Sequence, residues 1–183
     1  MTCRLKSIAV YCGHQFGINP QFKRDAVAVG KLLAKNGIRM VFGGGDVGLM
    51  GTVATACLKN GGEVIGVSTD DVIAMQEPAH PEIELQVVDG VNERKQIMFD
   101  SADAFIILPG GVGTLNELTD IMTMQQIGET TKPLFFLNTD GFWNPLVRLM
   151  KHMQKNGFIV KTDSYNIFGA DTVAELKKQI MNY

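Results

Sequence analysis

Short apolar runs alternate with amphipathic stretches along the whole chain, and this alternation restricts the fold more than any other sequence feature. The apolar runs are rich in Val, Ile and Phe, which is typical of strands covered on both faces of a sheet. In the stretch after the first run, Phe22, Ala26, Val29 and Leu33 recur at helical spacing, and Gly37 marks its end. Strand–helix alternation with short connections predicts a doubly wound, mainly parallel α/β sheet with helices on both faces.

The pattern places the expected elements along the chain. Strands are expected at residues 7–12, 38–42, 64–67, 85–88, 105–108 and 134–137, with a short extended piece at 166–168. Helices are expected at residues 21–36, 49–60, 92–101, 114–127, 143–156 and 172–181. Residues 68–84 fit neither pattern, and we expect a mobile flap there. No repeat or linker divides the sequence, which predicts a single domain over residues 1–183.

Charge and cysteine content exclude several classes of function. The 17 basic and 19 acidic residues give a net charge of −2, which argues against a strongly basic nucleic-acid-binding domain. The three cysteines are odd in number and match no zinc spacing, which favours a reduced, cytoplasmic setting without a metal site. The first residues do not resemble a signal peptide, and no apolar run reaches the roughly 18 residues of a membrane span. We therefore expect a small-molecule ligand and no nucleic-acid or membrane partner.

A first glycine-rich loop separates an expected strand from an expected helix. It contains Gly43, Gly44, Gly45 and Gly48. Their spacing matches G-x-G-x-x-G, a pattern that lets a phosphate approach the backbone at a helix N-terminus. A tight turn without a ligand is the alternative, although three consecutive glycines exceed what a turn needs. A nicotinamide site would need Asp70 or Asp71 on the ribose, and it would normally follow the first strand rather than the second.

A second glycine-rich loop follows the strand expected at residues 105–108. Its glycines are Gly110, Gly111 and Gly113. Thr114 and Glu117 come next with the T-x-x-E spacing of a helix capping box, which would explain both side chains without a function. The capping box does not explain the three glycines. Two such loops in one small domain favour a phosphorylated ligand across the strand ends.

Arg94 is the third feature. It lies on a helical stripe with Ile97, Met98 and Ser101. An arginine on a mostly apolar stripe either extends its charge to solvent or faces a pocket, and spacing alone slightly favours the first interpretation.

Taken together, three segments resemble the LONELY GUY (LOG) family, the cytokinin riboside 5′-monophosphate phosphoribohydrolases. The matching segments are residues 43–51 (GGGDVGLMG), 93–95 (ERK) and 109–117 (PGGVGTLNE). The resemblance extends from about residue 8 to about residue 158. Many relatives carry the older label of lysine decarboxylase, but no sequence feature here marks a pyridoxal-phosphate lysine.

The resemblance implies a Rossmann-like homodimer that needs no cofactor. It implies hydrolysis of the N-glycosidic bond of a nucleoside 5′-monophosphate, AMP or N6-substituted AMP, to the free base and ribose 5-phosphate. Arg94 and Glu117 match the family's catalytic pair. The matching nucleotide contacts are Lys95, Gly111, Gly113, Thr114, Thr123 and, across a one-residue gap, Glu77.

The expected chemistry suits these residues. Glycosidic cleavage develops positive charge on the ribose, and Glu117 can stabilise that charge or activate the attacking water. Arg94 can orient Glu117 or assist the leaving base, while both glycine loops would hold the 5′-phosphate. A non-catalytic nucleotide or cofactor carrier of related fold is the alternative, and retention of Arg94 and Glu117 favours hydrolysis.

Four positions depart from the family pattern and leave the preferred base open. His14 replaces a usual serine, Asp46 a usual uncharged residue, Asn92 a frequent histidine and Met124 a common tryptophan. We expect Met124 to line an adaptable base pocket.

Overall fold

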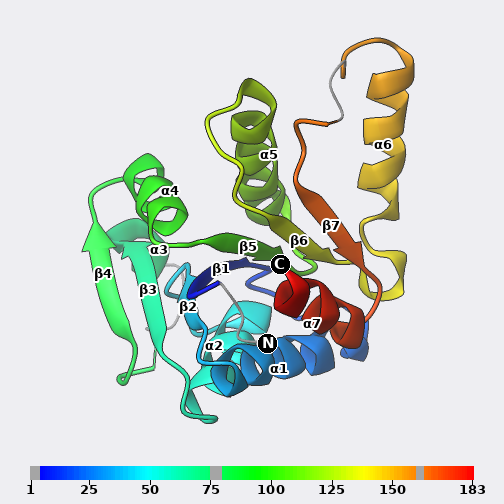
Figure 1. The fold of residues 1–183 in the computed structure, drawn as a ribbon. Helices are drawn as coiled ribbons and strands as arrows, with labels where there is room; N and C mark the ends of the chain where they lie inside the picture. Colours follow the sequence, from blue (N-terminus) through cyan, green and yellow to red (C-terminus); the bar gives the residue numbers. More distant parts are fainter. Residues whose placement is uncertain (1–4, 75–79, 160–162) are drawn as a thin grey trace.

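A seven-stranded sheet forms the centre of the computed structural model, which describes residues 5–74, 80–159 and 163–183 (Figure 1). All strand pairings recorded between these residues are parallel, in the order β4-β3-β2-β1-β5-β6-β7. The strands are β1 (Ser7–Tyr11), β2 (Arg39–Phe42), β3 (Val64–Thr69), β4 (Glu84–Val88), β5 (Ala104–Ile107), β6 (Leu134–Leu137) and β7 (Ile167–Ala170). The predicted doubly wound parallel sheet is confirmed.

Helices cover both faces of the sheet. The helices are α1 (Pro20–Lys35), α2 (Gly48–Leu58), α3 (Asp70–Ala74), α4 (Val91–Asp100), α5 (Val112–Ile127), α6 (Asn144–Lys155) and α7 (Val173–Asn182), with a 3₁₀ turn at Thr139–Gly141. Figure 1 shows α1, α2 and α7 on one face and α4, α5 and α6 on the other. Strand β1 contributes side chains to the hydrophobic core on each face of the sheet. Ile8 and Val10 pack with α1, α2 and α7, and Ala9 and Tyr11 pack on the opposite face.

Local sequence explains where the helices start and stop. Helix α1 begins where the Asn19 side chain accepts a hydrogen bond from the Gln21 N–H at 2.9 Å, with Pro20 in the first turn. Helix α5 ends at Gly128, which adopts the left-handed conformation with φ of 82°.

The start of α5 contradicts the capping-box interpretation. The helix begins at Val112, two residues earlier than expected, and Gly111 is its N-cap residue without a side-chain capping bond. Thr114 is therefore inside the first turn and Glu117 is beyond it. A capping box requires the threonine at the N-cap position, so the two side chains need another explanation.

Two other segments differ from the expectation. Residues 68–69 complete β3 and residues 70–74 form the short helix α3, so the first part of the stretch expected to be a flap is regular. Residues 75–79, which include Glu77, lie outside the described residues. Residues 167–170 form a full edge strand that pairs with β6 over four positions.

Strand order locates the crevice where a ligand is expected. The chain passes from β1 to β2 on one side, whereas β5 lies on the other side of β1. Ligands of open α/β sheets bind at this switch point, beyond the carboxyl ends of the strands. The loops after β1 and β5 meet there, since the Gly13 N–H donates to the Pro109 carbonyl at 3.0 Å.

Candidate active site

The second glycine loop presents an open helix N-terminus at this crevice. Gly111 and Gly113 are exposed, and a Cβ atom at either position would meet no neighbouring atom within 4 Å. In the described part of the chain, the N–H groups of Val112, Gly113 and Thr114 have no hydrogen-bond partner. Unpaired N–H groups at the positive end of a helix dipole favour an anion, and phosphate fits this chemistry.

A cavity of about 170 Å³ lies in front of this helix end. Six of the residues expected from the sequence line it: Gly43, Arg94, Gly111, Gly113, Thr114 and Glu117. Cys12, Gly13 and His14, from the loop after β1, complete the wall that faces the glycine loop. We call this space the loop cavity.

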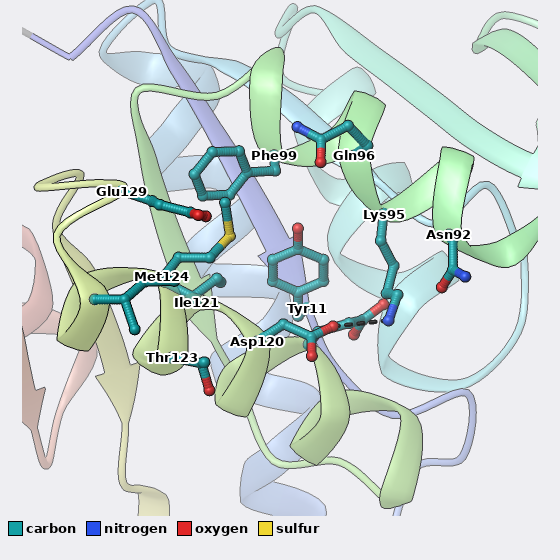
Figure 2. Close-up of a pocket in the computed structure, with 12 residues that line it drawn as sticks. Tyr11, Asn92, Lys95, Gln96, Phe99, Asp120, Ile121, Thr123, Met124 and Glu129 are labelled. Atoms are coloured by element: carbon teal, nitrogen blue, oxygen red, sulfur yellow. Dashed lines mark hydrogen bonds and ion pairs between the residues drawn. The ribbon is translucent and has the colours of Figure 1, made fainter.

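A second cavity of about 390 Å³ lies between α4 and α5 (Figure 2). Its lining contains Asn92, Lys95, Gln96 and Phe99 from α4, and Asp120, Ile121, Thr123, Met124 and Ile127 from α5. We call this space the helix cavity. Tyr11 and Glu117 line both cavities and therefore lie at their junction.

Burial sets the acidity of Glu117 at the junction. Loss of solvent raises the pKa of this carboxyl to about 7, although the positive charges of Arg94 and Lys95 oppose the shift and Asp120 adds to it. A carboxyl with a pKa near 7 exchanges a proton readily at neutral pH. Such a group in a cavity is a candidate for general acid–base chemistry.

Arg94 faces the loop cavity, so the solvent-directed interpretation is wrong. Its Nε–H donates to the Val67 carbonyl at 2.8 Å, and its Nη2 donates to the Gly43 carbonyl at 3.3 Å. The helical stripe could not reveal this direction, because both acceptors belong to other elements of the fold.

Lys95 lies in the helix cavity rather than at the glycine loop. Its Nζ donates to Asp120 Oδ2 at 2.7 Å and to Asn116 Oδ1 at 3.1 Å, and Figure 2 shows the ion pair as a dashed line. Thr123 lines the same cavity, and its hydroxyl donates to the Thr119 carbonyl at 2.8 Å. A nucleotide contact by either residue stays a prediction for this second space.

The space around the first glycine loop is mostly filled by other parts of the protein. Gly44, Gly45 and Gly48 are buried and do not line either cavity. Gly48 lies against the backbone of His14, and the N–H groups of Leu49 and Met50 donate to the Gly13 carbonyl at 3.1 and 3.3 Å. The start of α2 therefore already holds an acceptor from the chain itself.

Two further positions of the glycine loops lie outside the loop cavity. Asp46 lines a separate groove between α1 and α2, so its charge is away from both cavities at Glu117. Gly110 packs against the side chain of Thr114, where a Cβ atom would collide with the hydroxyl.

Sequence reasoning missed Tyr11, Phe99 and Asp120 as site residues. Tyr11 is only 4% exposed, and burial raises the pKa of its phenol above the ordinary value. Figure 2 shows its ring at the centre of the helix cavity. Its place as the last residue of the central strand was the available signal, because such residues border the crevice. Phe99 and Asp120 gave no comparable signal.

The fold and the two neighbouring cavities define a Rossmann-like α/β protein with an acidic group and a helix N-terminus at its switch point. Within the described ranges no group of three His, Cys, Asp or Glu side chains can hold a metal ion. Nor does any described helix have the length and apolarity to span a bilayer.

Curated relatives identify the particular family. The chain is 39% identical over 180 residues to the cytokinin riboside 5′-monophosphate phosphoribohydrolase LOG of Oryza sativa subsp. japonica, covering 98% of this chain and 74% of the relative. It is 40% identical over 155 residues to the enzyme of the same name from Rhodococcoides fascians, covering 84% and 78%. A family model described as "Possible lysine decarboxylase" matches residues 50–180. The chain belongs to this family, the LONELY GUY (LOG) family.

Solved structures support the fold. The molybdenum cofactor carrier protein of Chlamydomonas reinhardtii aligns with a TM-score of 0.72 at 20% identity, covering 98% of this chain and 100% of that one. The molybdenum cofactor binding protein of Rippkaea orientalis aligns with a TM-score of 0.66 at 23% identity, covering 97% and 98%. At this level of identity the similarity concerns the fold alone.

Proposed function

We propose that the chain hydrolyses the N-glycosidic bond of a nucleoside 5′-monophosphate to give the free base and ribose 5-phosphate. The position of Glu117 carries this proposal, because its carboxyl lies where an open helix N-terminus and a larger, partly apolar cavity meet. The relatives that match most of the chain are named phosphoribohydrolases, which supports the same activity.

The two cavities suggest how a nucleotide binds. The 5′-phosphate would accept hydrogen bonds from the free N–H groups of Val112, Gly113 and Thr114. The ribose would then lie at Glu117, and the base would enter the helix cavity between Phe99 and Met124. This placement separates the binding group, phosphate, from the reacting bond at C1′, so that binding energy can hold the ribose in the reactive position.

The chemistry then follows from charge. As the bond from C1′ to the base nitrogen lengthens, positive charge develops on the ribose, and the carboxylate of Glu117 stabilises it. Water adds its oxygen to C1′, and its proton leaves through Glu117 to the departing base. The Arg94 guanidinium opposes the rise of the Glu117 pKa and so keeps more of the carboxyl ionised.

A non-catalytic carrier explains less of the site. A carrier needs the open helix N-terminus, but it has no use for a buried carboxyl whose pKa is about 7 beside an arginine. Hydrolysis uses both groups.

Base release tests the proposal directly. Purified protein is incubated with AMP and with an N6-prenylated AMP, and free base and ribose 5-phosphate are followed by chromatography. We expect release from both substrates and loss of release in Glu117→Gln. Binding of AMP without release in the unaltered protein would support the carrier instead.

A cytoplasmic homodimer is part of the same proposal. An apolar cavity of about 210 Å³ between α5 and α6, lined by Leu118, Met122, Leu146 and Met150 among others, supports an association surface on this face. Sedimentation velocity would detect the dimer, and a monomeric mass at micromolar concentration would contradict it. Fractionation of the source cells would test the compartment.

A further inference from the structure

We propose that the first glycine loop positions the Arg94 guanidinium and does not bind the substrate phosphate, with Gly43 as the positioning residue. This inference rests on the proposed hydrolysis. It assigns a role to the loop whose sequence most resembles a nucleotide-binding fingerprint.

The side edge of the guanidinium is held at two points. Nε–H donates to the Val67 carbonyl within β3, and Nη2 donates to the Gly43 carbonyl directly after β2. Among the described residues no partner is recorded for Nη1. The two carbonyls therefore fix the plane of the group, while its outer edge stays available at the loop cavity.

Only glycine leaves room for this arrangement. A Cβ atom at position 43 would collide with Nη2 of Arg94 and would lie 3.2 Å from Met50 Sδ. The required feature of Gly43 is thus its missing side chain, and the close neighbour is a side chain of the same protein.

The space beside the other glycines of the loop is filled by protein. Gly44 has a φ of +80°, and its Cβ position is filled by Leu85 and Ser68. The N–H groups of Leu49 and Met50, in the first turn of α2, bind the Gly13 carbonyl, as described above. At the second loop, open space around Gly111 and Gly113 occurs together with first-turn N–H groups that have no recorded partner, and this combination favours phosphate there.

Substitution of Gly43 by alanine tests the role. The added methyl displaces the guanidinium, and a shift of about 1 Å in a catalytic group can lower turnover by about 100-fold. We expect that loss in kcat, with the KM for AMP changed by less than about threefold. Gly90→Ala is the matched control, because a Cβ atom there meets no neighbour within 4 Å, and its activity should stay within about twofold.

A double-mutant cycle separates this role from a general structural one. If Gly43 acts through Arg94, then Gly43→Ala lowers kcat by less than about threefold in an Arg94→Ala background. Additive losses would overturn the proposal, as would a KM raised more than tenfold by Gly43→Ala with kcat unchanged.

Chemical rescue gives a readout that does not require the Gly43 variant to fold. Free guanidinium at non-denaturing concentration should restore about tenfold activity to Arg94→Ala, because the two carbonyls can hold it. Methylammonium, which lacks the planar fork, should restore none. Equal rescue by both cations, or rescue by neither, would overturn the proposal.

The failure of the proposed function would be recognised separately. If the unaltered protein releases no base, the proposed hydrolysis is wrong. The positioning of Arg94 by Gly43 is then tested by titrating the Glu117 carboxyl with ¹³C NMR. Both variants should then raise the Glu117 pKa, since Arg94→Ala removes a nearby positive charge and Gly43→Ala displaces it. An unchanged pKa in Gly43→Ala would overturn the positioning role.

Discussion

The two glycine loops have similar sequences and opposite surroundings. Residues 43–48 and 110–113 each join a strand of the sheet to a helix. In the first loop, the glycines are buried and two helix donors, the N–H groups of Leu49 and Met50, bind the Gly13 carbonyl. In the second, Gly111 and Gly113 are exposed and the helix donors are free. A glycine pattern therefore shows that something approaches the backbone closely, and the fold decides whether that is protein or ligand.

The strongest test removes the carboxyl that follows the second loop. Glu117→Gln should reduce base release by at least about 1,000-fold, because the developing charge on the ribose loses its counter-charge. Binding of AMP should stay within about threefold in isothermal titration calorimetry, since the helix N-terminus is unchanged. Turnover close to the rate of the unaltered protein would mean that Glu117 takes no part in the mechanism. The two loops would then no longer differ in function.

A glycine of the first loop should matter for stability. Gly48 has a φ of +60°, and a Cβ atom there would collide with the backbone of His14. Gly48→Ala should therefore lower the free energy of unfolding by about 3 kcal/mol, from left-handed strain and overpacking together. Urea denaturation measures the change. Unaltered stability combined with a raised KM for AMP would instead place a ligand at this loop.

The pH dependence should locate the chemistry at the second loop. Because the pKa of Glu117 is about 7 and the ionised form is the active one, kcat/KM should fall about tenfold per unit as pH decreases below 7 and level off above it. Phosphate also titrates near pH 6, so AMP binding to Glu117→Gln over the same range is the control. A profile that falls above pH 7 would mean that the protonated carboxyl is the active form.

The smallest expected effect comes from a glycine of the second loop. Gly113 lies in the first turn of α5 with open space around its Cβ position. Gly113→Ala should keep or slightly raise stability, by up to about 0.5–1 kcal/mol, because alanine favours the helix. The methyl would obstruct the phosphate and raise the KM for AMP about tenfold. A destabilised variant with normal KM would make the two loops equivalent.

Much of the fold could be predicted because its signals are local. Among the residues that the structure describes, apolar runs and helical spacing predicted every strand of the sheet and every α-helix except the short α3, with most boundaries within two residues. The start of α5 was misplaced because T-x-x-E has the same spacing inside a first turn as at a cap, and only the backbone distinguishes them.

The sequence by itself determined the parallel α/β sheet, the loops at its carboxyl edge and the family, because each depends on neighbouring residues or on matching segments. Tertiary structure alone decided that Arg94 turns toward the loop cavity, that Lys95 pairs with Asp120 and that the exposed glycines of the second loop have open space beside them. The reason is physical. These outcomes depend on carbonyls and side chains from elements far apart in the chain, and no local pattern specifies which of them will fill a given space.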